Sequence, residues 1–534
     1  GVLAALGTEH AQLLAHLSHL ADCLSTELLP KPKERLLAAV CELSTLCLSV
    51  PPSPPDVPPP HILAALAQLD RAFGFSSGAA SDEAGAALLA GYRQHFVKDF
   101  LAERPASLSE MTSKLDMWRG LLESALDAAG GSGPQHLGTI VIGGKCAHLT
   151  FAQQPLVEVP GQYAADAEPT PEAHALIDRF AADVSVRRDH AAAVTTRSFS
   201  LIADDGVRHS LHLRLETPVR AHTALQLERA QQLLRLINRR LLKSREARRR
   251  ALYLHLPLQL RIGKGVALHA EDASAISLAS TLLSARAASG LPPQGAVLTH
   301  QRTLSRGTVA PDDEARRERL RQAFDDACRA VPEDVLSNAL TAQLTKPLQR
   351  WELTRTFASQ LGLHALLCHT VGLRVQQPQC VVISCTSGNL CFVDFDPLLK
   401  PAPEVKAASA PPPVTMPFRL TRNLQRLATP FGIDGTFAAA FAAGAECIAN
   451  AQKCPIALWL DYLSAAELEG GAFEAPWGSG AEQAAGLALS VCPTTTVKKD
   501  GKAADVHATL RALIAEATGA EALQAMPPAW QSWL

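Results

Sequence analysis

The sequence predicts an α+β protein that is mostly helical, and three observations support this prediction. Residues 1–127 show helical periodicity only, residues 128–262 gather strand patterns around one long helix, and the later residues return to helical periodicity. A chain of 534 residues is too long for one hydrophobic core and suggests two to four domains. Its 47% hydrophobic and 19% charged content is typical of a globular protein.

The composition narrows the expected partners and compartment. A formal net charge of −2 gives no overall attraction to nucleic acid or to a membrane surface. The 12 cysteines include no C-x-x-C pair, as expected in the reducing cytosol or nucleus. Cys380, Cys385 and Cys391 form the closest group, and we expect buried thiols there because no histidine lies at ligand spacing. No signal peptide or membrane span is expected, and the start at Gly1 suggests a piece of a longer protein.

Residues 1–127 are expected to form antiparallel helices in a solenoid or bundle. Two apolar stripes mark the first two helices: Leu13, Leu14, Leu17, Leu20 and Leu24, then Leu36, Leu37, Val40 and Leu43. The proline-rich stretch Pro51–Pro60 cannot continue a helix and predicts a stiff connector. Helical patterns resume at His61 and at Ala86, and a last amphipathic helix is expected over Leu108–Leu126.

The next part predicts a small sheet with one helix packed on it. The pattern around Asp204, Asp205 and Gly206 predicts a hairpin, because apolar residues alternate on both sides of a turn sequence. The other expected elements are strands at Thr139–Ile142, Leu156–Val159, Leu252–Leu260 and Val266–Leu268, and a helix over Leu225–Arg245.

Helical periodicity returns at Ala279 and is interrupted by two expected loop inserts, residues 287–311 and 400–416. The predicted helices are Glu314–Ala330, with Asp312 or Asp313 as its cap, Thr354–Val371, Phe437–Ala451, Ile456–Leu468 and His507–Leu523. The chain ends in a tryptophan-rich apolar segment, Met526–Leu534, which is expected to pack against the body.

The stretch Gln379–Pro397 predicts a second hairpin within this helical part. Two short apolar strands flank Ser387-Gly388-Asn389, where Gly388 supplies the backbone freedom that a tight turn needs. Two carboxylates, Asp394 and Asp396, follow the second strand. In protein kinases such a hairpin carries a magnesium ligand, and the loop before it carries the catalytic base.

The order of elements resembles the C-terminal half of a phosphatidylinositol-3-kinase-related kinase and, within that superfamily, the TRRAP family of pseudokinase coactivator subunits. The resemblance covers about residues 100–534. The matching segments are Val157–Gly161, Glu228–Asn238, Ser244–Arg250, Leu254–Pro257, Pro417–Asn423 and Met526–Leu534. The resemblance implies a two-lobed protein-kinase-like fold: residues 1–127 end a FAT-type helical repeat, 128–262 form the N-lobe, 263–500 the C-lobe and 501–534 a FATC-like tail.

The resemblance also places the catalytic positions, and most of them lack the required side chain. The phosphate-binding lysine falls at about Glu216, and no lysine occurs between Lys145 and Lys243. The catalytic loop corresponds to residues 371–380, which hold no Asp, His or Asn. Asp394 occupies the position of the metal-binding aspartate. Asp396 stands where the family has a glycine, two positions later. We therefore expect a pseudokinase with no cofactor and no metal, in which Glu216, Asp394 and Asp396 are vestigial.

A basic run near the end of the long helix is the remaining candidate site. Its members are Arg239, Arg240, Lys243, Arg245, Arg248, Arg249 and Arg250. One interpretation is a surface for an acidic partner, and the other is a solvated helix C-terminus whose cations oppose the helix dipole. His364 and His369, upstream of the hairpin, are interpreted as packed or exposed helix residues.

By resemblance, the expected function is a non-catalytic scaffold in a nuclear histone acetyltransferase coactivator complex of the SAGA type. Its expected partners are other subunits and acidic transcription activators, with no small-molecule substrate and no direct contact with nucleic acid. Two alternatives stay open. The chain is an active Ser/Thr kinase with degenerate motifs, using Asp394, Asp396 and a displaced His369, or it is a helical nucleic-acid-binding module using its basic run.

Overall fold

The structure, a computed structural model, describes residues 10–49, 57–76, 83–130, 136–152, 157–163, 170–189, 194–215, 221–263, 266–270, 272, 274–288, 318, 321–322, 325–326, 329, 332–342, 344–371, 373, 375, 378–393, 417–428, 433–449, 506–519 and 530. The chain divides into two compact units: the first holds residues 1–224 and 257–273, and the second holds 225–256 and 274–534. The boundaries of these two units differ from those of the four predicted domains, and the predicted boundaries stay predictions.

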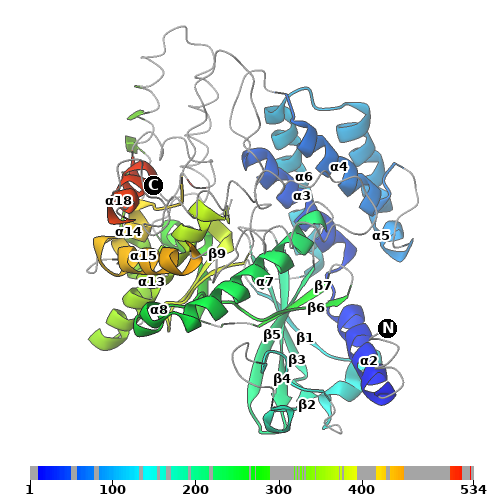
Figure 1. The fold of residues 1–534 in the computed structure, drawn as a ribbon. Coiled ribbons are helices and arrows are strands. Elements are labelled where there is room, and N and C mark those ends of the chain that lie inside the picture. Colours follow the sequence, from blue (N-terminus) through cyan, green and yellow to red (C-terminus); the bar gives the residue numbers. More distant parts are fainter. Residues whose placement is uncertain are drawn as a thin grey trace. The chain divides into compact units, whose positions relative to one another are not determined.

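The first unit combines helices with an antiparallel sheet (Figure 1). Its helices are α2 (Ala11–Glu27), α3 (Pro32–Ser49), α4 (Pro60–Phe73), α5 (Glu83–Phe96), the π-helix η1 (Val97–Ala102), α6 (Leu108–Gly130) and the 3-10 helices η2 (Gly144–Thr150) and η3 (Pro171–Ala173). Its strands are β1 (His136–Val141), β2 (Ile177–Phe180), β3 (Asp183–Asp189), β4 (Val194–Ala203), β5 (Arg208–Leu215), β6 (Gln259–Gly263) and β7 (Val266–Ala270).

Helices α3 to α6 share one apolar core, as their sequence periodicity predicts. The predicted stripe of α3, from Leu36 to Leu43, is completely buried. Trp118 of α6 packs edge-on against Phe96, and its indole nitrogen donates a hydrogen bond of 2.9 Å to Asp99. Burial of these large aromatic groups supplies much of the stabilisation of this helical part.

Helix α2 forms where predicted, but it packs on the sheet and not on α3 to α6. Its buried residues Leu20 and Leu24 belong to the core cluster that contains Phe199 and Leu213 of the sheet. Leu17, which the stripe places in the core, is 39% exposed. The stripe correctly predicts a buried face, but periodicity does not say which element covers it.

The sheet follows the strand order β1-β3-β4-β5-β7-β6, with β2 also paired to β4, and all described pairings are antiparallel. The predicted hairpin is confirmed as β4 and β5, in which Phe199 lies opposite Leu211. Gly206 closes the turn with φ +80°. Strands β2 and β3 are not predicted from the sequence, and the predicted strand Leu156–Val159 is reduced to one bridge between Glu158 and Leu176.

The predicted strand Leu252–Leu260 is wrong over most of its length, since β6 begins only at Gln259. Leu252 and Leu254 are buried, so the alternating pattern reflects real packing. The backbone of Leu254, however, is paired with a side chain: Asn238 of α7 accepts from its N–H and donates to its carbonyl, both at 2.8 Å. An amide side chain thus takes the place of a neighbouring strand.

The second unit is mostly helical, as predicted. Its helices are α7 (Ala221–Lys243), α8 (Arg245–Arg249), α9 (Leu278–Ala288), α12 (Val335–Thr341), α13 (Pro347–Thr370), the 3-10 helix η6 (Pro378–Cys380), α14 (Arg422–Ala428), the π-helix η7 (Ile433–Phe437), α15 (Ala438–Ala449) and α18 (Val506–Thr518). Its strands are β8 (Ala275–Ser277), β9 (Val381–Ser384) and β10 (Leu390–Phe392). Most of the inserts 287–311 and 400–416, the caps Asp312 and Asp313, and the predicted helix Ile456–Leu468 lie outside the described residues.

Helix α13 forms the centre of this unit and lies beside α15 (Figure 1). Gly362 allows this close approach: an added Cβ would lie 2.4 Å from the carbonyl oxygen of Phe437, the last residue of η7, and 3.3 Å from Ala440 Cβ of α15. Trp530, the described residue of the predicted packed tail, is 1% exposed and belongs to the same core. The Arg419 guanidinium lies 5.5 Å from the centre of its ring.

No single described helix is long and apolar enough to cross a membrane. One strongly bent pair, residues 422–428 and 433–448, meets the length and composition requirement only when both parts are added together.

Candidate functional site

The hairpin that should carry the catalytic machinery is present in the second unit. Strands β9 and β10 pair antiparallel, with Ile383 opposite Leu390, and β8 adds to the other side of β9. Gly388 has φ +73°, as the turn sequence predicts. The turn lies directly on α13, because an added Cβ at Gly388 would lie 2.2 Å from the Leu353 carbonyl oxygen. The hairpin is therefore fixed to the central helix.

A polar network anchors the turn further. The Asn389 side-chain oxygen accepts hydrogen bonds from the Tyr253 hydroxyl (2.6 Å) and from the Gln360 amide (3.0 Å). Gln360, which is 1% exposed, also accepts from the Leu390 backbone N–H at 2.8 Å. These polar groups are used for holding the hairpin in place, since a buried amide needs its hydrogen bonds satisfied.

The described residues of the run expected to form the catalytic loop belong largely to the core. Val371, Leu373 and Val375 are buried, with exposures of 0%, 1% and 4%. The Cys368 thiol donates to the Leu373 carbonyl oxygen at 2.8 Å, which ties this run to the end of α13. Buried alkyl groups neither accept a proton nor bind a metal ion, so these three positions have no catalytic chemistry.

The two upstream histidines are helix residues of α13. His364 is 3% exposed, and its ring lies 4.0 Å from that of Phe392. Burial lowers the pKa of His364 from the ordinary 6.5 to about 4, although a hydrogen bond to the Leu390 backbone opposes this shift. The imidazole is therefore neutral at pH 7 and enclosed by the core. His369 lies in the last turn of the helix and is half-buried.

This pKa predicts a loss of stability in mild acid. The pKa of His364 is lower in the folded protein than in the unfolded chain. The contribution of the neutral imidazole to the free energy of unfolding is therefore complete above pH 6.5 and is lost as pH falls towards 4. We expect the loss to reach roughly 2–3 kcal/mol. In urea unfolding of the second unit between pH 7 and 4, His364→Asn, which keeps a donor but cannot titrate there, should flatten the profile. The exposed His95→Asn should leave it unchanged, and a wild-type slope in His364→Asn would contradict the assignment.

The buried thiols near the hairpin agree with the sequence interpretation. Cys380 and Cys391 are buried, and Cys385 is half-buried. Burial raises the pKa of Cys391 to about 12, so this thiol stays protonated at neutral pH and is a poor metal ligand. The vestigial residues Glu216, Asp394 and Asp396 lie outside the described residues, and their roles stay predictions.

The basic run spans the end of α7 and all of α8. Ser244 separates the two helices, and its hydroxyl accepts from the Ala247 N–H at 3.3 Å as the cap of α8. Arg240 and Lys243 occupy the last turn of α7, where cations oppose the helix dipole. The exposed members are Arg239, Lys243, Arg245, Arg248 and Arg249. This part of the run fits the interpretation as a solvated helix end.

The last two members of the run differ, because they line a cavity of about 510 Å³ in the second unit. Arg249 and Arg250 are joined there by Arg355 of α13, whose guanidinium lies 5.2 Å from the centre of the Trp351 ring. The remaining lining is uncharged: Leu252, Ser359, Gly435, Thr436, Ala439 and Ala440.

One acid partly offsets this positive charge. Glu246 accepts from Arg249 at 2.9 Å and from Arg250 at 2.7 Å, and these bonds lower the pKa of Glu246. Arg355 has no ion pair with a described residue and is exposed on the cavity wall. The cavity therefore carries net positive charge beside an exposed aromatic ring, which suits a short acidic segment with an apolar side chain.

The sequence does not identify Arg355 as a member of this site, nor Trp351 as the aromatic ring beside Arg355. They lie one helical turn apart on α13, more than 100 positions after the basic run. Only the tertiary fold brings Arg355 to the cavity that Arg249 and Arg250 line. The available signal is the i, i+4 spacing of Trp351 and Arg355, which places both on one helix face.

Comparison with known proteins shows what the chain is similar to. Residues 220–459 match the family described as phosphatidylinositol 3- and 4-kinase. The chain is 27% identical over 390 residues to the SAGA complex/NuA4 acetyltransferase complex subunit TRA1 of Saccharomyces cerevisiae, covering 66% of this chain and 10% of that protein. It is 25% identical over 366 residues to the transformation/transcription domain-associated protein of Mus musculus, covering 66% of this chain and 13% of that protein.

Two further similarities concern kinases. The serine/threonine-protein kinase SMG1 of Danio rerio is 25% identical over 118 residues, which is 22% of this chain and 3% of the kinase. Among solved structures, the FAT and kinase domain of CtTel1 superposes with a TM-score of 0.56 at 15% identity, covering 89% of this chain and 34% of that one. This second similarity shows the fold.

The chain thus spans about a tenth of the length of the curated relatives that it matches. The predicted fold class is confirmed: a mostly helical α+β chain with the kinase-like fold. Residues 220–459 thus resemble the phosphatidylinositol 3- and 4-kinase family, and the chain is similar to TRA1 and to the transformation/transcription domain-associated proteins.

Proposed function

We propose that this chain is the kinase-like, non-catalytic part of a scaffold subunit in a nuclear histone acetyltransferase complex of the SAGA type. One combined observation carries the proposal: the chain aligns over 66% of its length with a SAGA/NuA4 subunit while its own catalytic-loop run, residues 371–380, holds no Asp, His or Asn. The chain keeps the kinase-like fold, but without these catalytic side chains the fold does not transfer phosphate.

The absence of catalysis is supported by the number of groups that are missing together. Loss of one well-placed electrostatic group costs about 10²–10³ in rate, or roughly 3–4 kcal/mol. Here the base, the magnesium-binding Asn and the phosphate-binding Lys are all missing at their expected places. The described part of the loop contributes Val371, Leu373 and Val375 to the core. A single Asp394 does not replace these groups.

An active kinase is the second candidate, favoured by the similarity of 118 residues to SMG1. It would need Asp394 and Asp396 to bind magnesium and His369 to act as the base. His364 does not serve this purpose, because it is enclosed by the core and neutral. Magnesium-dependent nucleotide binding distinguishes the two candidates.

The role in assembly is tested by affinity purification of the intact protein from nuclear extract followed by mass spectrometry. The expected result is co-purification of acetyltransferase and adaptor subunits in stoichiometric amounts. Recovery of the intact protein without any acetyltransferase subunit would contradict the proposed function.

We further assign the cavity around Arg355 as the surface that receives an acidic activator. A fluorescent peptide rich in Asp and Glu with one Phe or Trp is expected to bind the purified chain, more weakly as salt rises. Arg355→Glu should weaken binding by about tenfold or more, since it reverses the unpaired charge on the cavity wall.

The control variant for this experiment is Arg239→Glu, which changes the same net charge at an exposed position of α7 outside the cavity. We expect its effect to stay below about threefold. Equal weakening by both variants would mean that the whole basic run attracts the peptide without a defined pocket, and would contradict the assignment to this cavity.

A further inference from the structure

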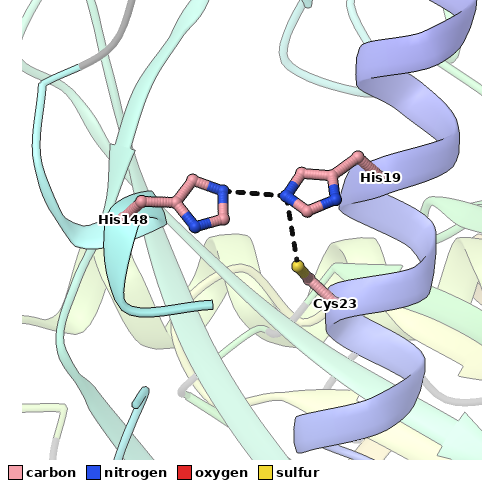
Figure 2. A group of neighbouring side chains, drawn as sticks. All are labelled: His19, Cys23 and His148. Atoms are coloured by element: carbon pink, nitrogen blue, oxygen red, sulfur yellow. Dashed lines mark hydrogen bonds between the residues drawn. The ribbon is translucent and has the colours of Figure 1, made fainter. Parts of the chain in front are cut away.

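Three metal-ligating side chains converge in the first unit, and all three lie outside residues 220–459. His19 and Cys23 lie one turn apart on α2, so both side chains share one helix face. The 3-10 helix η2 brings His148 opposite them (Figure 2). The Nε2 atoms of the two histidines are 2.9 Å apart, and Cys23 Sγ lies 3.6 Å from His19 Nε2. All three donor atoms lie within 4.8 Å of one another.

The orientation of the rings points to a shared ligand. The ring centres are 4.9 Å apart with an interplanar angle of 24°, whereas the Nε2 atoms are much closer. The rings therefore approach each other through their Nε2 edges, and the Cys23 sulfur lies beside the Nε2 atom of His19 (Figure 2). A hydrogen bond between two imidazoles accounts for the first contact but does not require the thiol beside it.

Two of the three donor distances are close to those of tetrahedral zinc coordination, and the third, between Cys23 and His148, is within 4.8 Å. Zinc bonds of about 2.0–2.1 Å to nitrogen and about 2.3 Å to sulfur place two nitrogens about 3.3 Å apart and a nitrogen and a sulfur about 3.6 Å apart. The Cys23–His19 distance of 3.6 Å matches this value. The two nitrogens, at 2.9 Å, need to separate by only about 0.4 Å.

The chemistry of the donors selects the ion. Two imidazole nitrogens and one thiolate suit zinc, whereas magnesium and calcium prefer oxygen ligands. Cys23 is 5% exposed, but both histidines are exposed, so an ion can enter from solvent on the histidine side. The same open side leaves room for water as the fourth ligand.

We propose that His19, Cys23 and His148 bind a zinc ion that clips α2 to η2. Both elements already contribute to one core cluster, α2 through Leu20 and Leu24 and η2 through Cys146 and Leu149. A metal bond between positions 23 and 148 closes a loop of more than 100 residues and stabilises the folded first unit over the unfolded chain. The proposal is independent of the function assigned to the kinase-type domain.

The test is a titration of the purified, metal-free 534-residue chain with Co²⁺ and then Zn²⁺. The expected result is one Co²⁺ per chain, with visible d–d bands typical of tetrahedral geometry and a near-ultraviolet thiolate charge-transfer band, both removed by Zn²⁺. Cys23→Ser should abolish the charge-transfer band and weaken Zn²⁺ binding by at least about 100-fold, since even outer partners of ligands contribute 10- to 100-fold.

Two further variants make the outcome decisive. His16→Gln, on the same helix but outside the cluster, should bind the metal like the wild type. His148→Cys replaces one zinc ligand with another and should keep the metal while about doubling the charge-transfer intensity. The proposal is overturned if the wild-type chain shows no charge-transfer band, or if Cys23→Ser retains the wild-type spectrum. Loss of metal in a His16→Gln variant with normal circular dichroism would also contradict this ligand set.

Discussion

Replacing Glu34 with alanine is expected to lower the free energy of unfolding of the first unit by about 3–5 kcal/mol. Glu34 at the start of α3 pairs with Arg197 of β4 at 2.8 Å, and the two side chains are only 10% and 6% exposed. Two other nitrogens of Arg197, Nε and Nη1, have no hydrogen-bond partner among the described residues. Removal of Glu34 would leave a buried guanidinium without its counter-charge. Urea unfolding followed by circular dichroism measures the change.

Glu110 provides a matched control for this prediction. Both glutamates accept a hydrogen bond from a backbone N–H at their helix start, from Lys31 at 2.8 Å and from Ala106 at 2.9 Å. Glu110, however, is itself exposed (43%) where it pairs with Lys114, so Glu110→Ala should cost far less stability than Glu34→Ala. The double variant Glu34→Leu with Arg197→Leu should recover most of the lost stability. Equal costs for the two single variants would contradict the role of the buried pair.

Gly388→Ala is expected to destabilise the second unit by about 3 kcal/mol or more. A side chain at φ +73° is strained, and the new Cβ would lie 2.2 Å from the Leu353 carbonyl oxygen. Since the obstacle is the backbone of a central helix, the turn would have to leave α13 and break the hydrogen bonds of Asn389 to Tyr253 and Gln360. Denaturant unfolding of the variant, compared with the wild type, measures this cost.

The control for Gly388 is Gly120→Ala in the middle of α6, where no atom lies within 4 Å of an added Cβ. This variant should stabilise the chain by roughly 0.5–1 kcal/mol, because alanine is the better helix former. If Gly388→Ala had wild-type stability, the hairpin would not be fixed to α13. This result would contradict a structural role for the hairpin.

Much of the fold follows from local patterns in the sequence. The stripe Leu36–Leu43, the turn at Gly206 and the turn at Gly388 each predict the element that the structure shows. The failures share one cause, since a pattern reports burial but not the partner. Leu254 alternates like a strand residue, yet Asn238 satisfies its backbone. Helix α2 has the expected stripe and covers the sheet.

The candidate sites show the same limit: residues that are neighbours in the sequence are found, and residues from distant segments are not. The basic run is visible in the sequence because its members are neighbours, whereas the cavity also needs Arg355 from a distant helix. The His19, Cys23 and His148 cluster joins positions more than 100 residues apart, and no spacing rule connects them. Contacts between distant segments depend on tertiary packing, which single-sequence periodicity does not encode.

The most direct test of the central claim is nucleotide binding by the purified chain. Thermal unfolding is measured with millimolar ATP and Mg²⁺, and an active kinase of the same superfamily serves as the positive control. We expect an unchanged midpoint, because the phosphate-binding lysine and the magnesium-binding asparagine are missing at their expected places and Asp394 alone does not hold a nucleotide. A saturable, magnesium-dependent rise in the midpoint that Asp394→Asn removes would contradict it.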